Sequence, residues 1–500
     1  MYIRPRAFDL KTIADNVGRV ILAVGGAMAI PLVLSVSLGE WAPALNFLVG
    51  MLACFCFAAI TRLTCHSEGD VSWISGMPSV GFAWLAAMFF AAIPLFLSGH
   101  YSSFLDACFE SMSGLATTGL TLVQDLDHMS YGTNLWRHLI MFLGGQGIVL
   151  VVLAMFVNTS SWATEMYRGE AREDRIRPNI ASTARFIWAV SLVYLVICTL
   201  MLWAASFFAG MPPAKGLFDS ICIFIAGFDT GGFAPRSQGV IFYHSLWFEI
   251  AVIFTMLLGM INFSVHFRIW RGGRREFFRN VEMRTLAASL FTLLVLLTVG
   301  LARMNVYPDG VSAFRRGFFQ LVSAHSGTGF MTVYGSHFLT IWGPLAFFAL
   351  IIAMALGGAS GSTSGGIKAL RVNISIKSVW WDIRKVLSAP DSVLINRFHH
   401  LREVVVTGAL VRGVMVVAAC YLAAFIFGAL VLTLLGYQLP GALFESTSAT
   451  ANVGLTCGIT SPAMPWLAKV VFIIQMWAGR LEFISAFLLI RLLVVLVKGR

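Results

Sequence analysis

The sequence predicts an all-α polytopic membrane protein, built from four helix–pore loop–helix repeats in a pseudo-fourfold arrangement plus two extra N-terminal transmembrane helices. Hydrophobic residues make up 58% of the 500 residues and charged residues only 12%, which is too little charge for the surface of a soluble chain of this length. Apolar stretches of about 20 residues, long enough to cross a bilayer, recur along the chain. A glycine-bearing loop motif recurs between these stretches.

The basic residues are distributed unevenly. The chain carries a formal net charge of +11, and Lys and Arg gather in the N-terminal segment and in the connections 168–177, 268–279 and 377–402. The alternate connections 122–133 and 456–465 contain neither. This is a positive-inside bias, so we expect the N-terminus and the basic connections to lie in the cytoplasm. The bias explains the charge without nucleic acid as a partner.

Residues 1–78 lie outside the repeated pattern and are expected to form the two extra helices. The apolar run at 20–38 follows a basic start, as in a signal peptide, but no small-residue cleavage site follows it. With two helices in each of four repeats, the sequence predicts ten full spans. The pore repeats are expected at 79–158, 184–270, 282–383 (with an interrupted last helix) and 404–500.

A loop motif defines the repeats. An aromatic residue precedes a glycine by ten positions in three places, and Leu217 precedes Gly227 by ten in a looser fourth copy. The strict pairs are Phe109 with Gly119, Phe319 with Gly329, and Phe444 with Gly454. We expect each loop to follow a short half-helix. The apolar run after each loop carries an inner glycine: Gly144, Gly259, Gly357 and Gly479.

These loops are suited to a dehydrated cation. Non-helical backbone is tolerated at membrane depth where it lines a cavity, and rings of backbone carbonyls can replace the hydration shell of potassium. Glycine adopts the required positive φ without steric cost, and the C-terminal ends of half-helices favour a cation. We therefore expect potassium, as the transported substrate and with no cofactor, at Gly119, Gly227, Gly329 and Gly454. The expected selectivity-filter residues are Thr117, Thr118, Gly119, Ala226, Gly227, Thr328, Gly329, Val453 and Gly454.

Acidic residues accompany the loops. Asp125, Asp127 and Asp229 are expected near the outer mouth, either to concentrate cations or as ordinary solvated loop acids. Glu110 and Glu445 occupy matching places in two half-helices. We expect them to be structural, paired with the backbone or with a neighbour such as Arg137, rather than ion ligands.

The stretch GGASGSTSGGIK at 357–368 interrupts the last helix of the third repeat, because glycine and serine at this density do not continue a helix cheaply. Its helix places it roughly 25 Å inward, beneath the filter, where it could cross the pore as a gate. Arg480 lies about 22 Å deep in the fourth repeat and needs water, carbonyls or an acid as a partner. We expect it to contact the gate loop and hold the closed state. The expected gate residues are Gly357, Gly358, Gly361, Ser362, Gly365, Gly366, Lys368 and Arg480.

The segments FESMSGLATTGLT, GGASGSTSGGIK and GRLEF together resemble the Trk/Ktr/HKT superfamily of potassium transporters, and the resemblance extends over essentially the whole chain and is strongest to the membrane subunit of the bacterial Trk branch. It implies a homodimer with one pore per protomer in the cytoplasmic (inner) membrane of a bacterium. It also implies that Gly357 to Lys368 form a gate loop, that Arg480 is the pore arginine, and that a cytosolic nucleotide-binding regulatory subunit of the TrkA type docks on the inner face. Glycine rather than serine at Gly119 favours potassium over sodium.

Two other functions remain open from the residues. A proton- or sodium-coupled secondary cation symporter would need a titratable group on the pathway, for which Glu249, His325 and Glu482 are the candidates. An intramembrane enzyme is not expected, because the sequence contains no Ser/His, paired-Asp or HExxH constellation. A nucleotide site in this chain is not expected either, because no GxxxxGK[ST] motif is present.

Overall fold

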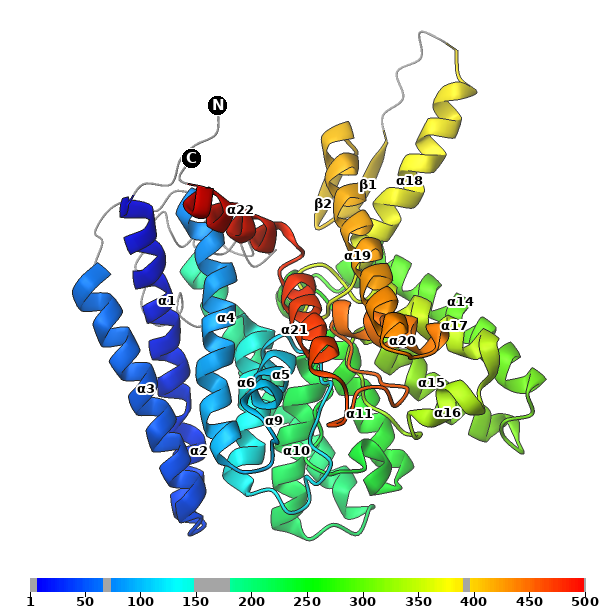
Figure 1. Ribbon diagram of the computed structural model, residues 1–500. Helices are drawn as coiled ribbons and strands as arrows, with labels where there is room; N and C mark the ends of the chain where they lie inside the picture. The colour runs from blue at the N-terminus through cyan, green and yellow to red at the C-terminus, as the bar shows by residue number, and fades with distance from the viewer. Residues whose placement is uncertain (1–6, 66–72, 148–179, 390–395, 499–500) are drawn as a thin grey trace.

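The computed structural model describes residues 7–65, 73–147, 180–389 and 396–498. These residues form a helical membrane protein (Figure 1), which confirms the predicted all-α polytopic class. Arg4, Arg6, the basic connection 168–177 and the last residues of the first predicted repeat, 148–158, lie outside the described residues.

The N-terminal region forms an antiparallel pair at one side of the molecule. α1 (Ala7–Ala27) and α2 (Ala29–Ser37) follow each other closely, so that Leu10–Ser37 is one candidate span. α3 (Trp41–Cys65) returns beside them, and α1 also packs against α4, the first helix of the repeats. The expectation of two extra helices ahead of the repeats therefore agrees with this arrangement.

Each repeat begins with a long apolar helix followed by a shorter one. Two of the shorter helices start with a side-chain cap: Ser103 accepts the N–H of Asp106 at 3.2 Å, and Asp309 accepts that of Ser312 at 3.2 Å. The other two have a proline in their first turn instead. The long helices are α4 (Trp73–Leu97), α9 (Ile180–Phe207), α14 (Val281–Arg303) and α19 (Gly408–Leu434). The half-helices are α5 (Phe104–Leu115), α10 (Pro213–Phe228), α15 (Gly310–Ser326) and α20 (Leu439–Thr450).

The helix after the loop is divided in the second, third and fourth repeats. In the second repeat, α11 (Leu246–Gly259) and α12 (Phe263–Trp270) meet at an angle of 97°. In the third, the segment 357–368 separates α17 (Gly343–Leu356) from α18 (Ala369–Val386). In the fourth, α21 (Trp466–Arg480) ends at a break before α22 (Ile484–Lys498), where Glu482 and Phe483 have positive φ. In the first, the described part of the helix is α6 (Tyr131–Gln146).

These breaks correct one expectation. The third repeat is not alone in having an interrupted last helix, since the second and fourth have one too. Hydropathy alone does not report a bend between two apolar segments, which is why the sequence suggested continuous helices in those repeats. Among the described residues, six helices are long and apolar enough to cross a membrane, or seven if the bent pair in the second repeat is counted as one span. The expected total of ten spans stays a prediction.

Short elements lie at the two faces of the molecule. β1 (Arg397–His400) and β2 (Arg402–Val405) pair as an antiparallel hairpin that projects, with the end of α18, from the face where α22 lies (Figure 1). The hairpin was not predicted. The other short elements are η1 (Gly239–Tyr243), α13 (Arg275–Arg279) and α16 (Ser336–Thr340).

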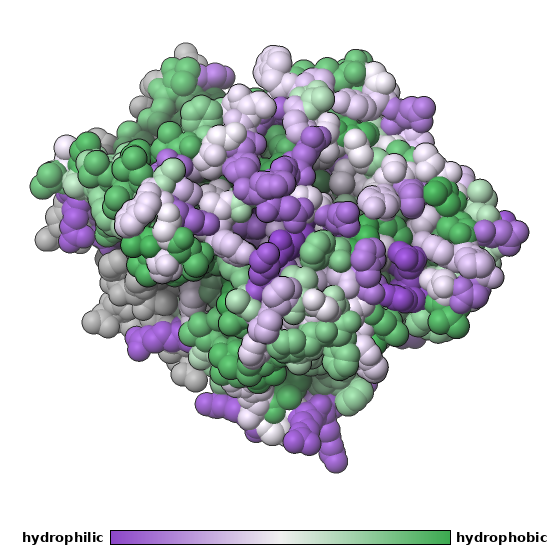
Figure 2. Space-filling view, turned by 90° about the horizontal axis from the view of Figure 1, so that it is seen from below, coloured by the Kyte–Doolittle hydropathy of each residue, from purple (hydrophilic) through white to green (hydrophobic). Residues whose placement is uncertain are grey.

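The opposite face shows how polarity is arranged around the centre of the molecule. Figure 2 shows hydrophilic residues gathered in its middle, with hydrophobic residues mostly around them. Exposed apolar side chains such as Leu52 and Leu63 on α3 and Leu422 and Ile426 on α19 belong to the outer walls. A polar centre inside an apolar wall is the distribution expected of a membrane protein with an aqueous entrance.

Candidate functional site

After each half-helix the chain turns back through a short segment of the same conformation. Four backbone hydrogen bonds of 2.8–3.0 Å fix the turns: Thr118 to Ser113, Gly231 to Ala226, Thr328 to Ser323, and Val453 to Ser448. Two residues in each segment have positive φ, the second being a glycine in all four: Thr117 and Gly119, Thr230 and Gly232, Gly327 and Gly329, Asn452 and Gly454. We name 117–119, 230–232, 327–329 and 452–454 the filter segments.

The register of the second repeat differs from the expectation. Ala226 and Gly227 lie inside α10, and Ala226 occupies the place of Ser113, Ser323 and Ser448 rather than that of a filter residue. The fourth filter-segment glycine is Gly232, with φ 73°. The assignment of Ala226 and Gly227 to the filter, and of potassium to Gly227, is therefore wrong.

Two sequence signals pointed to Gly232. Asp106 and Asp219 both precede a filter-segment glycine by thirteen residues when Gly232 is chosen. The inner glycine Gly259 then follows by 27 residues instead of 32, close to the 25 and 28 of the other repeats. The search for an aromatic residue missed this register because Cys222, not an aromatic, stands ten residues before Gly232.

The four segments close into a ring. A Cβ atom added to Gly119 would collide with the carbonyl oxygen of Gly231, one on Gly232 with that of Thr328, one on Gly329 with that of Val453, and one on Gly454 with that of Thr118. Each repeat thus contacts the next in cyclic order, and the fourth contacts the first. The side-chain amide of Asn452 also donates to Thr118 Oγ1 at 3.1 Å. This geometry requires glycine at all four contacts.

The inner glycines hold the second helices against this ring. A Cβ on Gly144, Gly259 or Gly479 would collide with the carbonyl oxygen of Leu115, Phe228 or Thr450, respectively, at the end of the half-helix in the same repeat. In the third repeat Gly357 instead begins the interruption, with φ 67°. The third repeat therefore uses its inner glycine for a turn and not for a helix contact.

The segment 357–368, which we name the gate loop, lies against the inner side of the ring. Thr363 Oγ1 lies 2.9 Å from the carbonyl oxygens of both Phe228 and Gly259, and 3.2 Å from Thr230 Oγ1. A Cβ on Gly365 would collide with the carbonyl oxygen of Ala451. The loop therefore reaches from the second repeat to the fourth.

Backbone hydrogen bonds hold the gate loop where its two ends meet and at its middle. Lys368 N donates to the carbonyl of Leu356 at 2.8 Å, which closes the loop at its base. The middle of the gate loop packs into the break between α11 and α12. There Ala359 N donates to Met260 O at 3.0 Å, and Phe263 N donates to Gly361 O at 3.2 Å. Thr363, which bonds to Thr230 of the ring and to the ends of α10 and α11, was not among the expected gate residues.

Arg480 connects three repeats beneath the ring. Its Nη1 donates to the carbonyl of Thr363 at 2.7 Å and to Thr117 Oγ1 at 3.1 Å, and its Nη2 donates to the carbonyl of Gly144 at 2.7 Å. The expected contact between Arg480 and the gate loop is therefore present. Carbonyl oxygens, and not an acid, are the partners among these bonds.

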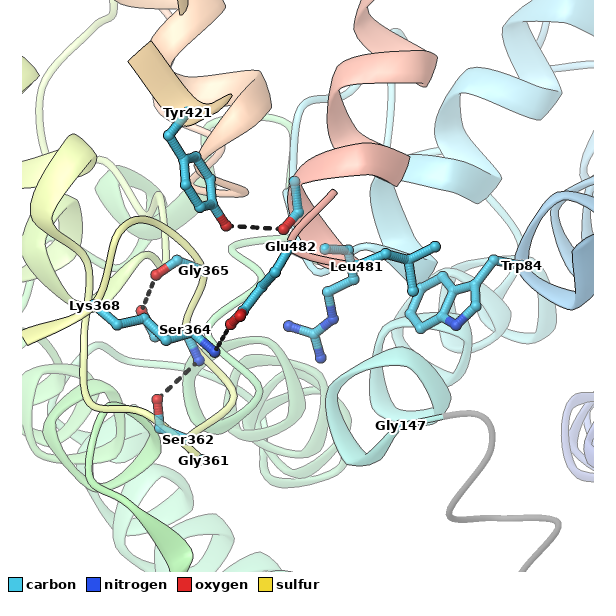
Figure 3. Close-up of a pocket in the computed structure, with 12 residues that line it drawn as sticks. Trp84, Gly147, Gly361, Ser362, Ser364, Gly365, Lys368, Tyr421, Leu481 and Glu482 are labelled. Atoms are coloured by element: carbon cyan, nitrogen blue, oxygen red, sulfur yellow. Dashed lines mark hydrogen bonds and ion pairs between the residues drawn. The ribbon is translucent and has the colours of Figure 1, made fainter. Parts of the chain in front are cut away.

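Glu482 is the acid of this region, and it pairs with the gate-loop end. Its carboxylate lies 2.8 Å from Lys368 Nζ and also bonds Arg371, and both basic side chains are largely buried (Figure 3). Lys368 is one of the expected gate residues, and its ion pair with Glu482 offsets its positive charge. The pair joins the first residue before α18 to the break between α21 and α22.

The three expected outer acids divide into two groups. Asp125 and Asp127 are exposed and pair with His128 at 2.8 Å and Arg236 at 3.6 Å. Asp229 is fully buried and accepts from Gln146 Nε2 at 2.8 Å, beside Gly145 on the inner side of the ring. The placement of Asp229 at the outer mouth is therefore wrong, because the register shift in the second repeat moves it to the end of α10.

The candidate proton carriers all have fixed partners. Glu249 forms two hydrogen bonds of 2.7 Å with Arg315. His325 Nε2 lies 2.7 Å from Ser289 Oγ. With Glu482 held by Lys368, each of the three groups is engaged within the protein.

A polar chain leads from the hairpin to the gate loop. His400 Nδ1, on β1, lies 3.6 Å from Glu282 Oε2, and Glu282 Oε1 accepts the N–H of Ser360 in the gate loop at 2.7 Å. His399 lies 3.1 Å from Glu276 on α13. Burial raises the pKa of the Glu276 carboxyl, but its bonds with His399 and Asn280 outweigh this and leave the pKa below its usual value.

Comparisons with known proteins agree with this geometry. A family model described as TrkH, cation transport protein, matches residues 43–494. An uncharacterized cation transporter of Methanocaldococcus jannaschii is 27% identical over 482 residues, 96% of this chain and 95% of that protein. The Trk system potassium uptake protein TrkH of Escherichia coli K12 is 27% identical over 425 residues, 83% of this chain and 84% of that protein.

The fold has a counterpart among solved structures. The crystal structure of the potassium transporter TrkH from Vibrio parahaemolyticus matches with a TM-score of 0.82 and 22% identity, covering 96% of this chain and 98% of the other. The resemblance stated from the motifs is therefore confirmed.

Proposed function

Because the chain belongs to the TrkH family of cation transport proteins, we propose that it takes up potassium across the cytoplasmic (inner) membrane of a bacterium through a channel-like pore. The N-terminus and the face bearing the hairpin lie in the cytoplasm. Relatives named as Trk system potassium uptake proteins support the choice of potassium.

One observation carries the proposal: four filter segments close into a ring in which the glycine of each repeat meets a backbone carbonyl of the next repeat. Four equivalent backbone segments around one axis can present carbonyl oxygens to a dehydrated cation. The half-helices end at this ring, and their C-terminal carbonyls add negative potential. The filter residues are Thr117, Thr118, Gly119, Thr230, Gly231, Gly232, Thr328, Gly329, Val453 and Gly454.

The gate loop and Arg480 close the inner side of the pore. The contacts of Thr363 with the ring, and of Arg480 with Thr363 and Thr117, support this role. A positive charge directly beneath the ring competes electrostatically with potassium. Opening then requires the gate loop and Arg480 to move apart, since both lie against the ring in the closed arrangement.

The protein acts as a homodimer with one pore per protomer and is regulated by a cytosolic nucleotide-binding subunit of the TrkA type. The chain His400–Glu282–Ser360 supports this regulation, because it links a cytosolic hairpin to the gate loop. A proton- or sodium-coupled symporter is the second candidate. The fixed partners of Glu249, His325 and Glu482 favour the channel-like mechanism over it.

Potassium-limited growth of cells that lack their own uptake systems tests the proposal. We expect the chain, expressed with a cognate regulatory subunit, to restore growth, and Gly119→Ser to weaken the rescue or admit sodium. Failure to restore growth with such a subunit, although the protein is present in the membrane, would contradict potassium uptake. A potassium flux that follows an imposed pH gradient in liposomes would favour the symporter.

A further inference from the structure

A single position in each half-helix faces the outward end of its filter segment. It lies nine residues before the filter-segment glycine and holds Glu110, Ile223, Gln320 and Glu445 in the four repeats. Glu110 and Glu445 contact the residues two and three positions after the glycine, where the chain leaves the ring, and Gln320 contacts the residue three positions after it. The carboxylates make the most bonds.

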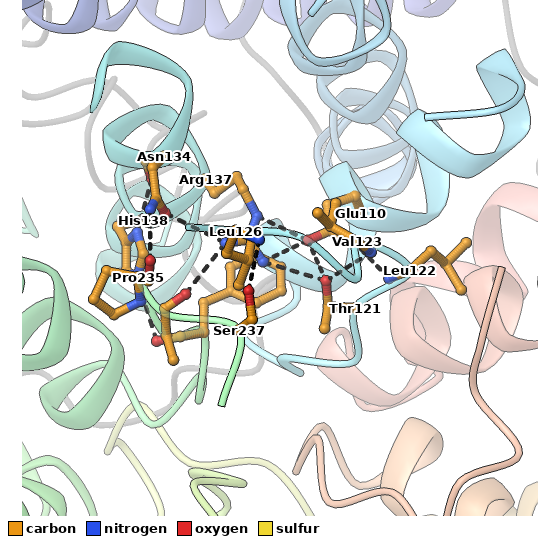
Figure 4. Close-up of polar contacts among 12 residues, drawn as sticks. Glu110, Thr121, Leu122, Val123, Leu126, Asn134, Arg137, His138, Pro235 and Ser237 are labelled. Atoms are coloured by element: carbon orange, nitrogen blue, oxygen red, sulfur yellow. Dashed lines mark hydrogen bonds and ion pairs between the residues drawn. The ribbon is translucent and has the colours of Figure 1, made fainter. Parts of the chain in front are cut away.

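In the first repeat Glu110 binds two consecutive residues of the outgoing chain (Figure 4). Glu110 Oε2 accepts the backbone N–H of Leu122 at 3.0 Å, and Oε1 accepts the hydroxyl of Thr121 at 2.8 Å. Arg137 donates to the same carboxylate at 2.7 and 2.9 Å, and both side chains are fully buried. The charge of Glu110 is thus offset by an arginine.

In the fourth repeat Glu445 makes the equivalent contacts without an arginine. Its Oε1 accepts the backbone N–H groups of Cys457 at 2.9 Å and Ile459 at 3.2 Å and the hydroxyl of Thr456, while Oε2 accepts the Thr460 hydroxyl at 2.7 Å. Glu445 is fully buried. Among the residues that the structure describes, no ion pair to it occurs.

The other two repeats show why the acid belongs there. In the second repeat the residue three after Gly232 is Pro235, which has no N–H to donate, and the facing residue is Ile223, which accepts nothing. In the third, Gln320 Nε2 donates to Thr332 Oγ1 at 3.1 Å, and Arg316 donates to the Thr332 carbonyl at 2.6 Å. A carboxylate therefore accepts from the outgoing chain in the first and fourth repeats, whereas the second repeat presents an apolar side chain there and the third an amide donor.

We propose that Glu445 and Glu110 are positioning residues that hold the outward ends of two filter segments and thereby set the discrimination of potassium from sodium. This rests on the proposed function, and it adds residues that touch neither the ion nor the gate. A carboxylate binding two or more donors of one short segment fixes the direction of the preceding carbonyls. A loosened segment can shrink its ring around sodium, which is the smaller ion, so selectivity falls.

The test is the ratio of potassium to sodium flux in proteoliposomes containing the full chain. We expect Glu445→Gln to lower the ratio about tenfold and Thr456→Val, which removes one donor, about threefold in the same direction. Ile223→Val is the matched control at the equivalent position and should leave the ratio unchanged. Thr121→Val should act like Thr456→Val, and it avoids leaving Arg137 unpaired as Glu110→Gln would.

The possible outcomes distinguish a failure of the proposed potassium uptake from a failure of the positioning role alone. A parent protein that passes no potassium in these vesicles overturns the proposed function itself. A parent that passes potassium, with an unchanged ratio in both threonine variants and in Glu445→Gln, overturns only the positioning role. If Glu445→Gln does not fold, the flux ratios of Thr456→Val and Thr121→Val test the positioning role. Equal loss of both fluxes, with the ratio preserved, indicates a purely structural role and also contradicts the inference.

Discussion

The ring of filter segments and the region beneath it, the outer and inner halves of the proposed pore, follow different rules. At the ring the four repeats are nearly equivalent: the same turn, the same pair of positive φ angles and the same contact with the next repeat occur four times. Beneath the ring the second helices differ in kind. One bends by 97°, one is interrupted by the gate loop, and one ends at Arg480.

We interpret this difference as a separation of ion coordination, at the ring, from gating, beneath it. An ion on an axis is coordinated by what the repeats share, so divergence at the ring would distort the site. A gate needs a part that can move against the others, and only a departure from the repeat supplies one. The gate loop of the third repeat occupies the bend of the second and is held by the arginine of the fourth.

The register of the second repeat gives the largest expected effect. Gly232→Ala places a Cβ against the carbonyl of Thr328 at a positive φ, so we expect potassium uptake to be lost. Gly227→Ala is the control: it crowds Thr255 Oγ1 at 2.8 Å within the helix contact and should cost about 1–3 kcal/mol of stability with potassium selectivity retained. Uptake and ion preference measured in the growth assay compare the two. If Gly227→Ala loses its preference for potassium while Gly232→Ala takes up potassium normally, Gly227 and not Gly232 is the filter glycine of the second repeat.

Removing the acid of the inner half should have the next largest effect. Glu482→Gln leaves Lys368 and Arg371 buried without their carboxylate, and breaking a buried ion pair in this way costs about 3–5 kcal/mol. We expect a lowered thermal unfolding temperature in detergent together with increased potassium leak. Glu403→Gln, on an exposed hairpin side chain, should change neither. An unaltered unfolding temperature in Glu482→Gln would show that the buried pair does not hold the gate loop.

Removing the cation beneath the ring tests the gate with less damage to the fold. Arg480→Gln keeps amide donors for the carbonyls of Thr363 and Gly144 but removes the charge. We expect basal potassium flux, measured without a regulatory subunit, to rise about tenfold, equivalent to about 1.4 kcal/mol in the opening equilibrium. The exposed Arg412 on α19 provides the control, Arg412→Gln. Equal flux in Arg480→Gln and the parent protein would contradict a closing role for this arginine.

The smallest expected effect concerns the path from the hairpin. Glu282→Gln keeps an acceptor for Ser360 N but loses the charge that faces His400. We expect about a threefold change in basal flux, as is typical for a residue that couples two sites without contacting the ion. Single-channel or liposome flux with and without a regulatory subunit measures it. A full response to the subunit in this variant would mean that the signal reaches the gate loop by another route.

Local patterns in the sequence predicted the repeated half of the molecule well. The spacing of Phe109, Phe319 and Phe444 to their glycines located three of the four segments, because the same half-helix and turn require the same number of residues. The fourth was misplaced because α10 contains its own Gly-Phe pair, Gly227 and Phe228, inside the helix.

The inner half was predicted less completely for a physical reason. The gate loop was visible as a run of glycine and serine, which disrupts a helix locally. Apart from Arg480, the partners of this region were not: Arg371, just after the loop, and Glu482 are separated by 111 residues, and Thr363 and Phe228 by 135. Contacts at such separations depend on how the repeats pack around the axis, and no spacing rule within one segment reports them.

The central claim is that four equivalent segments, including 230–232, form one cation site. An anomalous difference map from crystals of the protein soaked in rubidium, a potassium substitute, tests it most directly. We expect a peak on the pore axis bounded by the carbonyl oxygens of Thr118, Gly231, Thr328 and Val453. A peak coordinated by Ala226 or Gly227, or bound rubidium elsewhere in the protein with none in this ring, would contradict the claim.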